Sequence, residues 1–110
     1  MIVTLIFSLC VFQQAVSAEA QFDIAKTQKN LCVGLNGLAK VRQKRVAAAA
    51  YADVKRYWPE AHPFVEESCY RRAELLRSLE EIGAARGCFE EVLEAAPEAS
   101  DFYIRALLEL

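Results

Sequence analysis

The feature that most constrains the fold is a pattern that the chain contains twice. The first copy is Ala47, Tyr51, Val54 and Pro59-Glu60-Ala61, and the second, 38 residues later, is Ala85, Phe89, Val92 and Pro97-Glu98-Ala99. Residues at i, i+4 and i+7 share one face of a helix, where alanine lets a neighbouring helix approach and the aromatic ring fills the space beside it. The proline ends each helix, because the residue before a proline disfavours helical geometry. One helical hairpin cannot bury such a face alone, so the two copies predict hairpins that stack.

The rest of the chain is also typical of helices. It has only four glycines and three prolines in 110 residues, and no segment alternates apolar and polar residues over the length of a strand. We therefore expect an all-α fold of two and a half stacked antiparallel helical hairpins. The expected helices cover residues 22–40, 44–58, 63–78 and 81–95, and a terminal one begins at Ser100 or Asp101. Asn36-Gly37 is an alternative turn within the first helix, and residues 42–45 are the expected connection to the second.

The apolar positions of these helices predict which side chains form the core. Besides the repeated pattern, they are Ile24, Leu31, Leu35 and Leu38 in the first helix, Phe64, Cys69, Ala73 and Leu76 in the third, Ile82 and Leu93 in the fourth, and Tyr103, Ala106 and Leu107 in the last. Trp58, at the end of the second helix, is expected to fill the seam between hairpins, and the alternative is an exposed anchor for a partner.

The first eighteen residues differ from the rest and predict a secretory signal peptide. Residues 2–12 are apolar apart from Thr4 and Ser8, and Val16-Ser17-Ala18 precedes the expected cleavage site. The apolar run is shorter than the roughly 20 residues that span a bilayer, so we expect no transmembrane span after cleavage. Because no Lys or Arg precedes the run, a membrane anchor and an incorrect start remain alternatives. Cleavage would leave residues 19–110 as one helical domain in a periplasmic or secreted protein.

Charge is distributed unevenly along the chain. From Lys26 to Arg56 there are eight basic residues and one acid, Asp53, whereas from Tyr57 onward there are five basic residues and twelve acids. Solvated helix faces explain such runs most simply, and the alternatives are a basic face for an acidic partner or end-to-end association of copies. The net charge of −2 and the expected export argue against binding to nucleic acid.

Cysteine and histidine do not indicate a metal site, a cofactor or catalysis. Cys32, Cys69 and Cys88 would remain after cleavage, and this odd number leaves at least one thiol free or available for an intermolecular disulfide. The three cysteines are not spaced as a redox or zinc pair, and with the single His62 they are scattered over several expected elements. The sequence also has no Gly-rich phosphate loop. We therefore expect a protein that is not an enzyme and needs no cofactor.

The repeated pattern resembles the tetratricopeptide repeat, and in particular its periplasmic and outer-membrane-associated bacterial members. The second helix of that repeat carries a small residue, an aromatic one, a small or apolar one and a closing proline, matched here by Ala85, Phe89, Val92 and Pro97. The first helix carries a small residue among apolar ones, and Ala73 fits that position. The resemblance implies one repeat at 22–59, a second at 63–97 and a terminal helix at 100–110.

Two features depart from the family pattern. The period of 38 residues is longer than the usual repeat of about 34. Glu80 stands where the hairpin turn usually has a glycine, so we expect this turn to use a different geometry. The first repeat also matches well only in its second helix.

The resemblance implies a binding surface as well, because tetratricopeptide arrays bind peptides or protein segments on the face built by the first helix of each unit. Carried over position by position, that surface consists of Glu67, Tyr70, Glu74 and Arg77 in the second unit and Lys29, Asn36 and Lys40 in the first. The basic groups would hold carboxylates, the acids would pair with cations, and the tyrosine would supply apolar area with a polar tip. Taken singly, each of these residues is more simply a solvated surface residue.

Together these observations predict a non-enzymatic protein–protein interaction module or scaffold in the cell envelope, which binds a partner segment on the inner face of its hairpins. The competing prediction is a self-associating exported helical bundle, an inhibitor or structural protein without a peptide groove. Self-association through the terminal helix, where Ile104 and Leu108 are apolar, or through the odd cysteine stays open. The chain ends within an expected helix, which leaves truncation open as well.

Overall fold

The computed structural model describes residues 16–98 and 100–110, and its regular structure there is entirely helical. The helices are α2 (Ala18–Asn30), α3 (Gly37–Tyr57), α4 (Phe64–Ser78), α5 (Ile82–Ala95) and α6 (Asp101–Glu109). The prediction of an all-α fold is confirmed. Most of the expected signal peptide, residues 1–15, lies outside the described residues, whereas Ser17 and Ala18 belong to the cap and first turn of α2.

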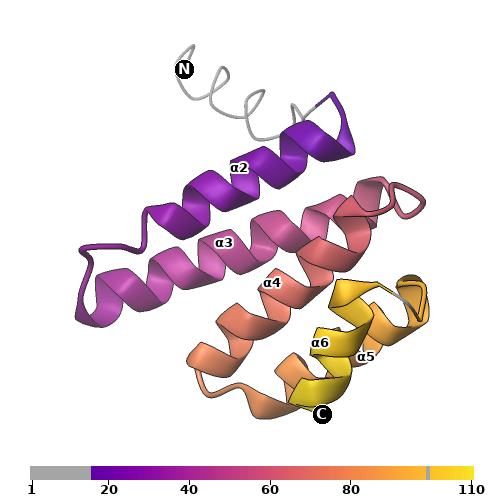
Figure 1. Cartoon of the computed structure of the whole chain (residues 1–110). Helices are drawn as coiled ribbons and strands as arrows, with labels where there is room; N and C mark the ends of the chain where they lie inside the picture. Colours follow the sequence, from indigo (N-terminus) through magenta and orange to yellow (C-terminus); the bar gives the residue numbers. More distant parts are fainter. Residues whose placement is uncertain (1–15, 99) are drawn as a thin grey trace.

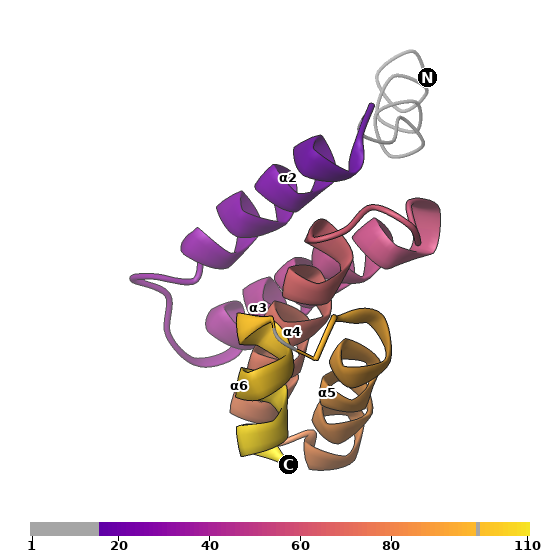
Figure 2. The ribbon, with the colours of Figure 1, turned by 45° about the vertical axis from the view of Figure 1, so that its right-hand side comes forward.

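The helices form hairpins that stack on one another. α2 pairs with α3, and α4 pairs with α5, while α3 and α4 pack together and join the two hairpins (Figures 1 and 2). α2 therefore lies at one end of the stack, and α5 and α6 lie at the other. α6 packs mainly on α5 and makes a smaller contact with α4.

The two copies of the repeated pattern occupy equivalent places in this stack. Each forms the second arm of a hairpin, the first in α3 and the second in α5. Their helical core positions are Ala47, Tyr51, Val54, Ala85, Phe89 and Val92, and all are at most 2% exposed. The prediction that these six residues form the core is therefore confirmed.

Two ion pairs link these second arms across the seam between the hairpins. Arg45 of α3 contacts Glu81 just before α5 at 2.9 Å, and Lys55 of α3 contacts Glu91 of α5 at 3.1 Å. Both pairs join residues that are 36 positions apart in the sequence, so α3 and α5 are aligned with the same offset at both ends of the seam. Because all four side chains are partly exposed, each pair contributes about 0.2–1 kcal/mol at most.

The first hairpin differs from the prediction at its turn. α2 ends at Asn30 and α3 begins at Gly37, so a helix over 22–40 and a connection at 42–45 were both wrong. Gly34 and Gly37 adopt positive φ values of +86° and +57°, a region that glycine enters at little cost. The alternative turn at Asn36-Gly37 is therefore confirmed, with Asn36 in extended geometry as the N-cap of α3.

α2 also buries a different face from the one predicted. Ile24 of α2, Leu31 directly after it and Leu38, which belongs to α3, are exposed. The buried residues of α2 are Ala18, Gln21, Phe22 and Ala25. The Phe22 ring packs 5.8 Å from the Tyr51 ring and 5.7 Å from the Phe64 ring, measured between centroids. This aromatic cluster orients the helix, so the aliphatic side chains on its other faces remain in solvent.

Two later core predictions were also wrong, because Ile82 and Leu107 are exposed. Ile82 is the first residue of α5, and only the next turns of that helix face α4. In α6, Ala106 is the fully buried residue, and Tyr103 is partly buried against the core. Trp58 is also partly buried against the core, in agreement with the expected seam position.

The turn between α4 and α5 has the geometry that glycine usually provides. The Glu80 N–H donates to the Arg77 carbonyl at 2.9 Å, and the Glu81 N–H donates to the Leu76 carbonyl at 3.0 Å. These two bonds define a Schellman motif, whose left-handed residue is Glu80 at φ +64°. The expectation of a different turn geometry was therefore wrong: a glutamate occupies the usual glycine conformation.

Candidate partner-binding groove

A groove runs along the side of the stack between the first arms of the two hairpins, α2 and α4. We call it the α2–α4 groove. One part, of about 220 Å³, is lined by Lys26, Lys29, Asn30, Tyr51, Glu67 and Arg71. The next part, of about 390 Å³, is lined by Lys29, Cys32, Val33, Lys40, Lys44, Glu74, Leu75 and Ser78. Lys29 borders both parts, so the two parts adjoin at this residue.

The α4 wall of the groove is held by a short chain of ion pairs. Arg71 contacts Glu74 at 3.0 Å and Glu67 at 3.6 Å, the i+3 and i−4 neighbours on the same helix face. Burial by itself would lower the pKa of Arg71, but the hydrogen bond to Glu74 and the charges of both carboxylates outweigh it and raise that pKa. Arg71 therefore stays charged and neutralises much of the acidity of this wall.

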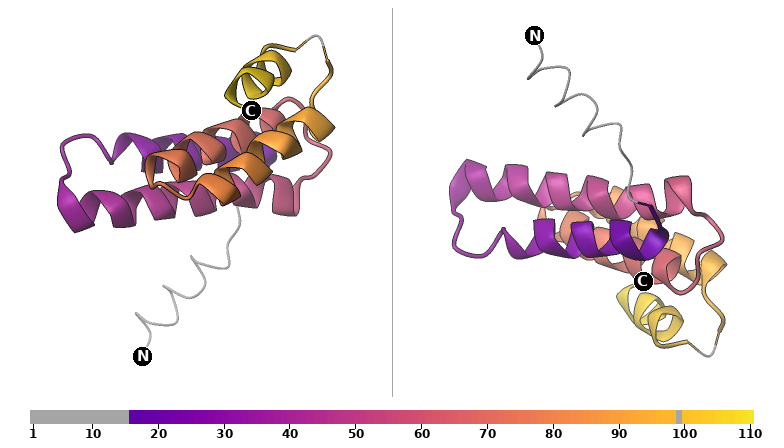
Figure 3. Two further views of the ribbon diagram at one scale, coloured as in Figure 1. Left: turned by 90° about the horizontal axis from the view of Figure 1, so that it is seen from below. Right: turned by 90° about the horizontal axis from the view of Figure 1, so that it is seen from above.

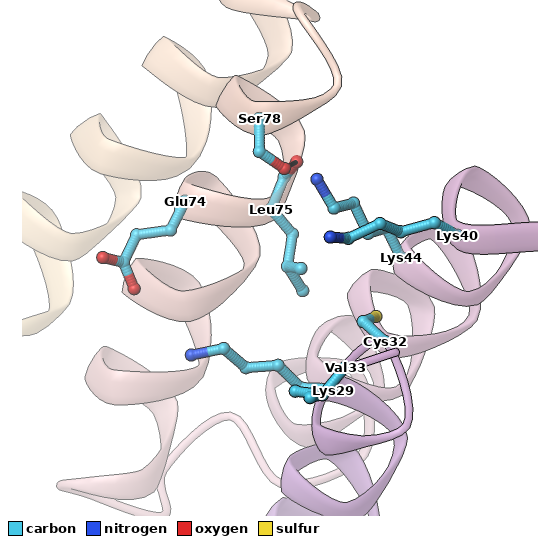
Figure 4. A pocket seen from close by; sticks show the side chains of 8 residues that line it. All are labelled: Lys29, Cys32, Val33, Lys40, Lys44, Glu74, Leu75 and Ser78. Carbon is cyan, nitrogen blue, oxygen red and sulfur yellow. Dashed lines mark hydrogen bonds between the residues drawn. The ribbon is translucent and has the colours of Figure 1, made fainter. Parts of the chain in front are cut away.

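The opposite end of the groove is strongly cationic. Lys40 and Lys44 extend from α3 toward Leu75 and Ser78, and Lys29 extends toward α4 from the end of α2 (Figure 4). Within residues 16–98 and 100–110, none of these three lysines has an acidic partner within 4 Å. The buried side chains of Leu75 and Cys32 form an apolar floor between them. The three lysines define what we call the lysine pocket.

Four of the seven residues predicted to bind a partner lie along this groove. Lys29, Lys40 and Glu74 line the lysine pocket, and Glu67 lines the adjoining part. Lys40 reaches the pocket from α3, although the sequence placed it on the first helix. Asn36 precedes α3 as its N-cap and is not among the residues that line the groove.

The other two predicted residues face α6 instead. The side chain of Tyr70 is buried, and its ring packs 5.6 Å from the Phe89 ring and 5.8 Å from the Phe102 ring. Arg77 forms an ion pair with Glu109 of α6, and its guanidinium lies 5.5 Å from the centre of the Phe89 ring. α6 covers this side of α4, so Tyr70 is a core residue and Arg77 is paired with α6.

Sequence reasoning missed three important groove residues, Lys44, Arg71 and Leu75. Lys44 was placed at the boundary of a turn, yet its spacing of four residues from Lys40 and three from Ala47 is the helical signal that would have found it. Arg71 and Leu75 lie one helical turn apart on α4. The resemblance did not include these two residues, because they do not stand at the family's groove positions that were carried over to this chain.

The buried thiols are poorly suited to nucleophilic chemistry. Cys32, Cys69 and Cys88 are all free and buried. Burial raises the pKa of Cys69 to about 12 and also raises the pKa of Cys88. Since the thiolate is the reactive form, both groups are protonated and inert at neutral pH.

His62 lies in the turn before α4, where its Nδ1 contacts the buried carboxylate of Glu66. This contact satisfies a carboxylate that would otherwise be costly to bury. Among the residues with described positions, no group of three or more His, Cys, Asp and Glu side chains could hold a metal ion. None of the helices α2 to α6 combines the length and the apolar character that crossing a bilayer requires.

A comparison of the chain with protein-family models, with curated proteins and with solved structures gave no match. The stacked hairpins follow from the structure itself, and the resemblance to tetratricopeptide repeats stays a prediction.

Proposed function

We propose that this protein is a non-enzymatic interaction module of the cell envelope that binds a segment of a partner protein in the α2–α4 groove. The groove is bounded by helices from both hairpins, so stacking of the repeats creates it. A partner segment lying along it would contact α2 on one side and α4 on the other. The signal-like first eighteen residues support the envelope location, and reading the first residue of the mature protein tests it.

The observation that carries this proposal is the lysine pocket. Three ammonium groups, which have no acidic partner among the described residues, surround an apolar floor. Hydrogen bonds from an ammonium group to a carboxylate are about twice as strong as those between neutral groups. The apolar floor would favour an aliphatic or aromatic side chain next to that carboxylate. The expected ligand is therefore a segment with an acidic residue beside an apolar one.

A peptide-display selection followed by titration tests this function. We expect enrichment of peptides with Asp or Glu next to an apolar residue. The double variant Lys40→Glu with Lys44→Glu should weaken binding of such a peptide by at least about tenfold, because each charge-assisted hydrogen bond contributes roughly 1.5–3 kcal/mol. The matched control is Arg86→Glu, an exposed charge reversal on α5 away from the groove. Equal affinity in the groove variant and the control would refute the assignment.

A second candidate function is self-association through α6. Ile104, Leu107 and Leu108 are exposed on this short helix, and apolar patches of this kind often mark interaction surfaces. Light scattering at increasing protein concentration, with and without reductant, separates this function from groove binding. A dimer that Leu108→Glu dissociates, combined with no peptide enrichment, would favour the self-associating bundle.

A further inference from the structure

The turn of the first hairpin carries a group of apolar side chains in solvent. Val33 is 83% exposed, Leu38 66%, Leu31 53% and Val41 37%. They occupy the end of α2, the loop and the first turns of α3. We call this surface the α2–α3 tip. It projects past α4 and α5 at one end of the molecule (Figures 1 and 3).

The same part of the chain is strongly basic. No acidic residue occurs between Ile24 and Ala52, a stretch with six basic residues. Arg42 is exposed and lies one helical turn after Leu38, on the same face of α3. Three acids of other elements lie close to this part of the chain, and two of the three are already paired. Glu74 contacts Arg71, Glu81 contacts Arg45, and Glu80 lies in the α4–α5 turn. An excess of positive charge therefore surrounds the exposed aliphatic side chains.

The shape of the tip helps to identify the partner. A projecting loop with exposed aliphatic side chains needs a matching hollow if it is to bind another folded protein. A fluid bilayer surface accommodates a projecting apolar loop without such a hollow. Aliphatic groups enter the boundary between headgroups and acyl chains, while Lys and Arg remain at the level of the phosphates. The charge is also complementary, since anionic lipids attract basic segments next to an apolar surface.

We infer that the α2–α3 tip docks on an anionic lipid bilayer. Val33 and Leu38 enter the interface, and Arg42, with the neighbouring lysines of α3, contacts the lipid phosphates. This docking leaves the α4 wall of the α2–α4 groove free. Val33 and the α3 lysines Lys40 and Lys44 also line the lysine pocket, so a docked bilayer and a bound peptide would share that part of the surface. Leu38 and Arg42 line neither part of the groove, so variants of these two residues test docking separately from peptide binding.

Co-sedimentation of the full chain with vesicles provides the first test. We expect binding to vesicles of phosphatidylcholine mixed equally with phosphatidylglycerol, weaker binding to phosphatidylcholine alone, and release at high salt. Arg42→Glu should lower the partition coefficient by at least about fivefold, since one basic residue near an anionic surface contributes about 1 kcal/mol. Val33→Asp combined with Leu38→Asp should reduce binding further. The matched control is Ile104→Asp with Leu108→Asp on α6, which should bind like the wild type.

A second measurement locates the contact, so that binding through another segment is not mistaken for docking of the tip. In a Trp58→Phe background, a tryptophan is placed by Val33→Trp in one variant and by Leu108→Trp in another. Brominated lipids should quench the fluorescence of the first variant and not that of the second. Equal quenching in both, or equal loss of sedimentation in tip and α6 variants, would overturn the proposal. Binding of the tip to polyglutamate but not to anionic vesicles would overturn it in favour of an acidic protein partner.

Discussion

At the scale of single residues, side chains that look equally suited to the core from the sequence differ in burial in the structure. Phe89 and Ile82 are both apolar residues of α5, yet the first is 2% exposed and the second is 56% exposed. The period of the repeated pattern identifies Phe89, because a ring at i+4 from a small residue faces the partner helix. Hydropathy alone also predicted Ile82 as a core residue, because hydropathy does not show at which turn a helix begins to contact its neighbour.

This difference leads to a prediction for stability. Phe89→Ala should lower the free energy of unfolding by about 3–5 kcal/mol, because it removes a buried ring and leaves a cavity. Ile82→Ala is the matched control and should cost no more than about 0.5 kcal/mol. Chemical denaturation monitored by circular dichroism measures both changes. A small loss in the Phe89 variant would contradict the core assignment.

A second residue-scale prediction concerns pH. Burial raises the pKa of Cys69 to about 12 in the folded protein, above its ordinary value of 9.0. Between these values the folded state holds a proton that the unfolded state has lost, so stability should fall as pH rises from about 9 to about 12. In Cys69→Ala, the free energy of unfolding should fall less over this pH range than it does in the wild type. Tyr51, whose pKa burial also raises to about 12, acts in the same direction above pH 10. An identical pH slope in Cys69→Ala and wild type would show that Cys69 contributes nothing.

At the scale of helices, the local sequence predicted where helices begin and end better than it predicted which face of a helix is buried. Pro59, Pro63 and Pro97 predicted the ends or starts of three helices to within a few residues. The face of α2 was not predictable in this way, because apolar Ile24 is exposed while polar Gln21 is buried. Gln21, a polar residue, is buried there because its amide donates to the Ala50 carbonyl at 3.0 Å. Such a partner is supplied by tertiary packing and leaves no local signal.

The turn after α4 gives a prediction at this scale. Glu80→Gly should raise the free energy of unfolding by up to about 1 kcal/mol, because a left-handed conformation costs roughly 1–2 kcal/mol for a residue with a Cβ and little for glycine. The greater entropy of glycine in the unfolded chain offsets part of this gain. The matched control is Glu90→Gly within α5, which should destabilise by about 1 kcal/mol. A loss of stability in Glu80→Gly would contradict the Schellman turn.

At the scale of the whole molecule, the repeat in the sequence predicted the stacked hairpins, while the position of α6 decided which predicted site residues are accessible. Lys29, Lys40, Glu67 and Glu74, which the resemblance assigned to the binding surface, line the groove. Tyr70 does not, because α6 returns onto α4 and α5 and covers its ring. No local feature of residues 63–78 reveals that a later helix will lie against them.

The central claim is that residues 47–57 and 85–95 are equivalent second arms within one continuous core. Native-state hydrogen exchange of the Tyr51 and Phe89 amides tests it most directly. Since both rings are buried in the same core, the two amides should exchange with free energies that agree within about 1 kcal/mol and match that of global unfolding. A single stacked core would be contradicted if one of these amides exchanged by a local opening of lower free energy while the other stayed protected.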